Sequence, residues 1–410
     1  MKITEPKTKP RNIPPFIADL RKNGRELYEK MGLPTSRMEE WRHTDVSELS
    51  KYEFVPIDSI GIGERHPNLE RLSEAMRHNP GVSNYLGHYA RPEENFFVAL
   101  NDAFFDDGAF IHIPEGIRTD TPIHLTYVHS PNRKKKTDQA KWALFPRNLV
   151  IVEKDASVTL IEDYIGDYRN YPDETDDLYL NVPVTEILLM EGAEAVHYKL
   201  QRESARAFHI ASVDVKQEAG SRFISHNVTL GGQLTRNNIH SYLRGTGASC
   251  TLNGLFVLNG NRHADHHTLI DHGAPGCTSR ELYHCILNDR ARGVFNGRIY
   301  VHSGAQQTDS NQTVRALLLS NDARMDARPQ LEIYADDVKC THGAAVGQLD
   351  DDSIYYLRSR GIGHDEARKM LIQAFSREIT GAFTLEPLQK EVEHFFEHFL
   401  SSEIRQPGGE

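Results

Sequence analysis

The stretch Asp155-Ala156-Ser157-Val158-Thr159-Leu160-Ile161 sets the pattern for the middle of this 410-residue sequence: a small turn residue, then a short alternating strand. An earlier copy is Asp107-Gly108-Ala109 before Phe110-Ile111-His112-Ile113. Later turns continue the series: Glu191-Gly192-Ala193, Glu218-Ala219-Gly220, Thr246-Gly247-Ala248, Gly273-Ala274, Arg290-Ala291, Gly304-Ala305 and Asp322-Ala323. Their alanines are 26, 29, 26, 17, 14 and 18 residues apart. These spacings fit one or two strands per step rather than βαβ units, which need helical stretches between strands.

The regularity favours a β-solenoid, in which each rung covers the apolar face of the next and small residues allow tight corners. A β-sandwich or a cupin barrel also consists of regular short strands and is the alternative. We therefore expect a mainly β protein with its core over residues 91–345, the alternation starting near Phe96. Helical domains are expected on either side, over residues 1–90 and 346–410.

Helical periodicity supports both flanking domains. Near the start, one stripe consists of Phe16, Leu20, Leu27 and Met31, closed by Gly32 and Pro34. After Leu349, the run Asp350–Asp352 suits the first turn of a helix, where backbone N–H groups are unpaired. Two further helices are expected, from about Asp365 to Glu378 and from Glu386 to Leu400.

The last of these helices has a broad apolar face, which includes Leu388, Val392, Phe395, Phe396 and Phe399. Two interpretations are open. The face packs on the end of the solenoid, as every solenoid needs a cap, or it binds a partner protein.

Composition narrows the function class. The formal charge of −11 argues against nucleic acid or an anionic membrane as the main partner, and no window approaches about eighteen consecutive apolar residues. The start of the chain lacks the pattern of a signal peptide. The cysteines, Cys250, Cys277, Cys285 and Cys340, include no Cys-x-x-Cys pair and fit reduced thiols in a cytoplasm. The phosphate-binding and dinucleotide-binding glycine motifs are absent, so we expect no bound nucleotide.

The stretch Asp336-Asp337-Val338-Lys339-Cys340-Thr341-His342-Gly343-Ala344 carries the first candidate site. In an extended segment, residues two apart point the same way, so Cys340 and His342 address one point. A thiolate and an imidazole on one face can bind a soft or borderline metal, or the imidazole can activate the thiol. A single pair cannot close a four-ligand site, so further ligands would come from elsewhere.

A second candidate is the histidine-rich stretch from His263 to His272. His263 and Asp265 share one strand face, and imidazole with carboxylate suits zinc or iron. A metal site of His263, Asp265 and His266 is the basis of one alternative function, a free-standing cytoplasmic metalloenzyme. Polar ladders along a solenoid face explain the same residues without a metal.

The sequence resembles the SufB/SufD family (the UPF0051 type) of iron–sulfur cluster assembly proteins along nearly its whole length. The resemblance is carried by Glu40-Trp41-Arg42-His43-Thr44, Leu100-Asn101-Asp102-Ala103-Phe104, Ile113-Pro114-Glu115-Gly116, His266-His267-Thr268-Leu269-Ile270-Asp271-His272, Gly293-Val294-Phe295-Asn296-Gly297 and the block from Cys340 to Ile362. Gly343 after His342, and the lack of a cysteine in Glu162-Asp163-Tyr164, resemble the SufD branch more than the SufB branch.

The resemblance implies a right-handed parallel β-helix between helical ends, in a scaffold subunit of the SUF complex that is itself no ATPase. The implied partners are a SufB-like paralogue bound through the β-helix and a SufC-like ATPase bound through the carboxy-terminal helices. For the isolated chain, a second copy of itself is a further partner. A nascent cluster would form near the SufB–SufD interface, shared with the partner. The sequence leaves open whether the complex carries a flavin.

Carried over onto this sequence, the resemblance makes His342 a ligand of the nascent cluster or its iron. Cys340 would assist as a thiolate, or be a small buried residue. The ATPase would bind at the carboxy-terminal helices, with contact residues Tyr356, Leu357, Arg360, Leu388, Val392, Phe395, Phe396 and Phe399. A purely structural platform that only holds its partners in register is the remaining alternative.

Overall fold

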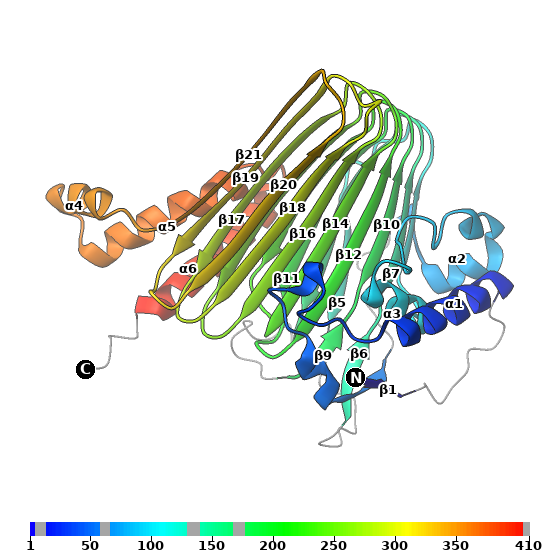
Figure 1. The fold of residues 1–410 in the computed structure, drawn as a ribbon, viewed down its shortest axis with the longest axis horizontal. Coiled ribbons are helices and arrows are strands. Elements are labelled where there is room, and N and C mark those ends of the chain that lie inside the picture. The colour runs from blue at the N-terminus through cyan, green and yellow to red at the C-terminus, as the bar shows by residue number, and fades with distance from the viewer. Residues whose placement is uncertain (5–13, 58–65, 129–139, 167–176, 405–410) are drawn as a thin grey trace.

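Two sheets, parallel except for one antiparallel pair at the amino-terminal edge of the larger one, wind together into a solenoid. The computed structural model describes residues 1–4, 14–57, 66–128, 140–166 and 177–404 (Figure 1). From β10 (Val184–Leu189) onward, successive strands alternate between the sheets, so one coil consists of two strands. The larger sheet contains β1 (Lys2–Ile3), β2 (Glu53–Pro56), β3 (Leu69–Arg71), β4 (Ala109–Ile113), β6 (Ala140–Leu144), β7 (Arg147–Val152), β9 (Tyr179–Asn181), β10 (Val184–Leu189), β12 (Phe208–Gln217), β14 (Leu234–Leu243), β16 (His263–His272), β18 (Arg292–Val301) and β20 (Arg324–Ile333). The smaller contains β5 (Ile123–Val128), β8 (Ser157–Ile165), β11 (Glu194–Arg202), β13 (Arg222–Thr229), β15 (Ser249–Leu258), β17 (Thr278–Leu287), β19 (Thr308–Leu318) and β21 (Val338–Gln348). The predicted solenoid is confirmed, and the sandwich and barrel alternatives were wrong.

The coils stack in register, which explains the turn spacing. Leu234, His263 and Arg292 are Cα partners in successive coils and lie 29 residues apart. Up to Ala274, each turn alanine precedes a strand of the smaller sheet, so the spacing equals a whole coil. From there to Ala323, the turns before strands of both sheets carry alanine, and the spacing halves. The sequence therefore predicted both step sizes correctly.

One corner of the solenoid is a ladder of left-handed glycines. Gly192, Gly220, Gly247 and Gly276 have φ between +64° and +71°. Each donates its N–H to a carbonyl of the next coil, for example from Gly192 to Ala219 over 2.9 Å. An L side chain is disfavoured in this conformation, so glycine fits the corner at low cost. In the next coil Gln307 takes the same position with φ +60°, and its N–H binds the carbonyl of Asp337.

The amino-terminal segment packs over the first coils of the larger sheet (Figure 1). Its helices are α1 (Pro15–Met31), α2 (Leu72–His78) and α3 (Phe96–Phe104), with 3-10 turns η1 (Glu39–Trp41), η2 (Ser47–Lys51) and η3 (Pro80–Asn84). The predicted first helix is confirmed as α1, which Gly32 ends with φ +67°. The expected alternating strand near Phe96 was wrong, because all nine residues of α3 are buried and its apolar run therefore shows no one-sided helical period.

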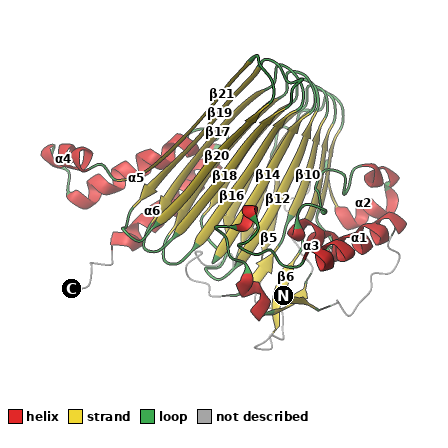
Figure 2. Ribbon diagram, in the orientation of Figure 1, coloured by secondary structure: helices red, strands yellow, loops and turns green. Residues whose placement is uncertain are grey.

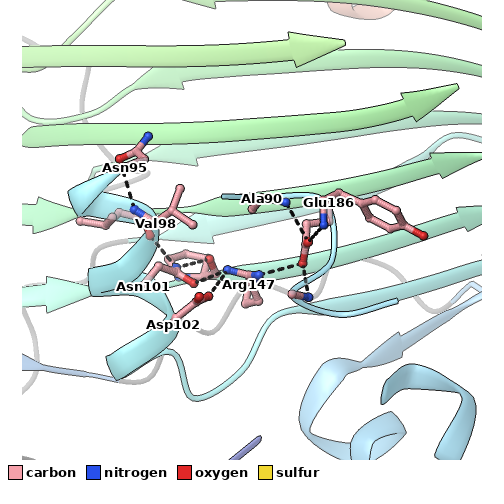
Figure 3. A network of polar contacts seen from close by, with 11 residues as sticks. Ala90, Asn95, Val98, Asn101, Asp102, Arg147 and Glu186 are labelled. Carbon is pink, nitrogen blue, oxygen red and sulfur yellow. Dashed lines mark hydrogen bonds and ion pairs between the residues drawn. The ribbon is translucent and has the colours of Figure 1, made fainter. Parts of the chain in front are cut away.

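A buried arginine fastens this segment to the solenoid. Arg147 of β7 donates to Asp102 of α3 and to Glu186 of β10, both over 2.7 Å, and all three side chains are buried (Figure 3). Glu186 also accepts backbone N–H bonds from Gly87, Tyr89 and Ala90. Asn101 bonds the carbonyls of Pro146 and Val182. These buried contacts tie α3 to β7 and β10 and hold the segment in one docking geometry.

The carboxy-terminal helices lie on the other side of the sheets from the amino-terminal group (Figure 2). They are α4 (Asp351–Ser359), α5 (His364–Thr380) and α6 (Glu386–Ile404), which confirms the three predicted helices within two to four residues. Asp350 caps α4 by accepting the N–H of Ser353. Residues of α5 and α6 pack on outward-facing side chains of the smaller sheet.

Candidate functional site

The solenoid ends in an uncovered coil made of β20 and β21. β21 is the last strand of the smaller sheet, and among the described residues no strand pairs with its outer edge. Its eleven residues are exposed or half-buried, whereas most of the preceding strands of that sheet are buried. A long edge strand with free N–H and C=O groups is a ready site for pairing with another chain.

Apolar side chains are exposed on this same coil. Ile333 is 37% exposed, Tyr334 59% and Val346 48%, and these three are among the eight large hydrophobic residues exposed in the described chain. Tyr334 contacts Tyr300 at 5.4 Å between ring centroids. Their concentration at an unpaired sheet edge indicates a surface that a partner covers.

Cys340 and His342 lie on this open coil and on one side of β21. Their Cα partners in the coil below are Ser310 and Gln312, both buried inside the solenoid. His342 is exposed, whereas Cys340 is half-buried beside Ile299, Val301 and Ala305. The i, i+2 geometry expected from the sequence is therefore present, at the end of the molecule.

The thiol of Cys340 is not activated in the isolated chain. Burial raises its pKa, Asp309 raises it further, and the backbone hydrogen bond with Ser310 lowers it. A thiol must lose its proton to bind a metal. The described residues offer no group of three His, Cys, Asp or Glu residues that could hold a metal ion, so a metal at Cys340 and His342 needs further donors from outside them.

The histidine-rich stretch has a structural role that its sequence did not reveal. Asp265 accepts a hydrogen bond from Thr44 over 2.5 Å and pairs with Arg236 over 2.9 Å and His267 over 3.0 Å. Arg236 also binds the carbonyl of Glu40, and its guanidinium carbon lies 3.9 Å from the centroid of the Trp41 ring. These contacts hold the Glu40–Thr44 motif against β14 and β16.

The metal set of His263, Asp265 and His266 is not assembled. The Nε2 atom of His263 lies 2.9 Å from the Thr44 hydroxyl, which also bonds Asp265. His266 directly follows Asp265 and therefore points to the other face of the strand. There it stacks on Phe256 at 4.7 Å, and burial lowers its pKa to about 3. With the Asp265 carboxylate already holding Thr44, Arg236 and His267, the structure gives no support to a metalloenzyme at this place.

The carboxy-terminal contact residues fall into two groups. Leu388, Val392 and Phe396 are buried against the smaller sheet, so the apolar face of α6 belongs to the core of this chain. The expectation that this face binds a partner was wrong for these three. The expectation that this face caps the end of the solenoid was also wrong, because α6 lies on the outer face of the smaller sheet. Phe395 is half-buried, and the guanidinium carbon of Arg202 lies 4.8 Å from the centroid of its ring. The side chain of Phe399 lies outside the described residues.

The exposed carboxy-terminal surface is on α4. Tyr355 is 73% and Tyr356 58% exposed, Leu357 is half-buried and Arg360 is exposed. Arg360 lies over the Tyr356 ring at 5.3 Å. An aromatic and arginine surface of this kind is typical of protein contacts.

Two family models match this chain. One, described as the SufBD core domain of the SUF system for FeS cluster assembly, matches residues 135–375. The chain belongs to the SufBD family. The second model, the SufBD protein N-terminal region, matches residues 68–125. None of the helices in the described ranges is long and apolar enough to cross a membrane.

Individual relatives agree with this SufBD assignment. SufD of Escherichia coli is 30% identical over 88% of both chains, and a SufBD family protein of Synechocystis is 32% identical over 91% of this chain and 89% of its own. SufB of Bacillus subtilis is 25% identical over 76% of this chain and 64% of its own. The family predicted from the sequence is confirmed.

The site of this SufBD protein also contains residues that sequence reasoning missed. Glu281, Gln312 and His342 are Cα partners in three successive strands, β17, β19 and β21. Only the register brings them together, since they are about thirty residues apart. The coil length could have revealed the column, if the strand boundaries had been known.

Proposed function

We propose that this chain is a scaffold subunit of a cytoplasmic SUF complex, without ATPase activity of its own, on which an iron–sulfur cluster is built. It pairs with a SufB-like paralogue through the edge of β21, and a SufC-like ATPase binds the exposed face of α4. The nascent cluster forms where β21 meets the paralogue, as cargo shared by the two proteins. His342 is an iron ligand, and Cys340 assists it as a thiolate.

The open last coil is the observation that carries this proposal. It combines a free eleven-residue edge, exposed apolar side chains and two soft or borderline ligands, whereas the corresponding surfaces of earlier coils are buried. A site with ligands from two proteins can release its cargo when the proteins separate, which suits assembly and transfer. Metal binding at Cys340 would displace the thiol proton, so loading would be favoured as pH rises.

The test is His342→Ala in the chain co-expressed with its paralogue and ATPase under anaerobic conditions. We expect the complex to assemble as before, with iron and acid-labile sulfide reduced roughly 10-fold or more, as for the loss of a metal ligand or its support. His364→Ala, an exposed histidine at the start of α5, is the control and should leave the yield unchanged. Equal yields from His342→Ala and the parent would refute the ligand role and favour a purely structural platform.

A further inference from the structure

Gln312 is a buried side chain with an unused hydrogen-bond acceptor. It is 0% exposed, and its Oε1 atom has no hydrogen-bond partner. A buried amide oxygen without a partner costs free energy, so such an atom calls for an explanation. The residue stacked on it in the open coil is His342.

The amide nitrogen of Gln312 is hydrogen-bonded to a buried carboxyl group. Gln312 donates its Nε2 hydrogen to Oε2 of Glu281 over 2.5 Å, one coil further into the solenoid. Glu281 is 2% exposed, and it forms no ion pair among the described residues. Gly297 of β18 leaves room for Nε2, because a Cβ there would lie 2.2 Å from that nitrogen.

The carboxyl of Glu281 settles which way the amide faces. A carboxylate accepts hydrogen bonds and donates none, so the amide must turn its NH₂ group toward Glu281. The oxygen is then the amide's free acceptor, and it is the atom that has no partner. Burial raises the pKa of Glu281 to about 7, while the hydrogen bond with Gln312 lowers it. Above that pH the carboxylate holds the amide in one orientation.

His342 is the residue whose ring N–H this oxygen can accept. Neighbouring strands lie about 4.8 Å apart, and side chains of Cα partners on one face are within reach of one another. Among its described neighbours, His342 has no hydrogen-bonded partner for its ring. An imidazole that donates one ring N–H to a fixed acceptor presents its other nitrogen, with a free lone pair, to a metal.

We propose that Gln312 is the positioning residue of His342 and that Glu281 locks it: the Gln312 Oε1 atom accepts one ring N–H of His342 and so selects the tautomer that binds iron. The inference deepens the proposed function, on which the iron-binding part rests. It adds two residues from the interior of the solenoid to a site whose ligands lie at the surface.

The test measures the tautomer of His342 directly, without iron, in the full-length chain. The protein is labelled with ¹⁵N-histidine, and the two ring nitrogens of His342 are assigned from the spectrum of His342→Ala. The two ring-nitrogen shifts, recorded at about pH 8.5, report the tautomer ratio. We expect one tautomer to dominate in the parent and both to be populated in Gln312→Met, which keeps the volume and loses the acceptor.

Three further variants make the result specific. Gln312→Glu can donate one O–H to Glu281 and keep its second oxygen as an acceptor, so it should restore the parent ratio. Glu281→Gln no longer fixes the orientation of the Gln312 amide, so it should move the tautomer ratio toward that of Gln312→Met. This variant replaces Gln312→Met as the test if Gln312→Met does not fold. Gln330→Met on β20, a half-buried glutamine outside the column, should change nothing. Identical ring-nitrogen shifts in the parent, Gln312→Met and Glu281→Gln would overturn the proposal.

A second readout separates this inference from the proposed function. In the co-expressed complex, Gln312→Met should lower iron and sulfide roughly 10-fold, the scale on which groups behind a metal ligand act. A changed tautomer with full cluster yield would refute the ligand role of His342 and leave the positioning role standing. An unchanged tautomer with reduced yield would refute the positioning role alone.

Discussion

At the scale of single residues, the position of a polar side chain along the solenoid decides what it can do. Ser310 and Gln312 are closed in by neighbouring coils, whereas Cys340 and His342, their partners in β21, have no coil above them. The same alternation that buries a residue in one coil therefore offers the equivalent residue to another protein in the last coil.

Buried Glu162 makes a prediction about pH. Burial alone would raise its pKa, but the contact with His197, the hydrogen bond from Thr185 and the nearness of Lys199 hold the pKa at about 2. Its contribution to stability is therefore complete above about pH 4.5 and is lost as pH falls toward 2. That loss is roughly 3 kcal/mol at 1.36 kcal/mol per pKa unit. In Glu162→Gln, the free energy of unfolding should fall less steeply over this range, as measured by urea titration at several pH values.

The control for this prediction is Glu115→Gln, which changes an exposed glutamate. It should reproduce the pH dependence of the parent. A Glu162→Gln curve parallel to that of the parent would show that Glu162 does not carry the acid sensitivity.

Residue-level reasoning from the sequence succeeded where geometry is local and failed where it depends on distant partners. That Cys340 and His342 share a face follows from the strand alone. The role of Asp265 could not be predicted, because Thr44 and Arg236 reach it from positions far away in the sequence. Glu281 and Gln312 went unnoticed for the same reason.

At the scale of elements, α4 and α6 should respond differently to mutation. The double substitution Tyr355→Ala/Tyr356→Ala removes two exposed rings from α4, so we expect binding of the ATPase to weaken by about 10-fold or more, as for contact residues of this kind. The free energy of unfolding should change by less than about 0.5 kcal/mol. Pull-down titration and urea unfolding measure the two effects.

Leu388→Ala on α6 is the matched comparison, because Leu388 is buried against the smaller sheet. It should cost about 2–5 kcal/mol of stability. Full ATPase binding by the tyrosine variant would place the docking surface elsewhere.

The sequence predicted where α4, α5 and α6 lie but not what their faces meet. The apolar stripe of α6 is the same whether it covers a partner or its own sheet, and only the fold shows that it covers the sheet. Helix α3 was missed because a helix buried on all sides has no polar face to give its period.

At the scale of the whole molecule, the open coil predicts how the chain associates. Val346→Lys puts a charge on the exposed edge strand, a device by which natural sheets prevent pairing. We expect affinity for the SufB-like paralogue to fall at least about 10-fold, as measured by titration of the purified proteins. Ile117→Lys charges a comparably exposed residue away from the last coil and should leave affinity unaltered. If both variants bind equally well, the interface is not at β21.

The whole-molecule fold was predictable because the turn signals recur along the chain, whereas the open end was not. Exposure of β21 depends on the absence of a further coil and on where the following helices go. Helices α5 and α6 run back along the outer face of the smaller sheet instead of closing its end (Figure 1).

Between the end of β21 at Gln348 and the start of α4 at Asp351 there are only Leu349 and Asp350. The chain from the Cα atom of Gln348 to that of Asp351 spans at most about 11 Å, so α4 follows the strand closely. A protein that binds α4 and moves it beyond that reach must pull on the strand that carries Cys340 and His342. The link is a short mechanical tether, through which a displacement of the helix reaches the exposed edge of the last strand without passing through the core.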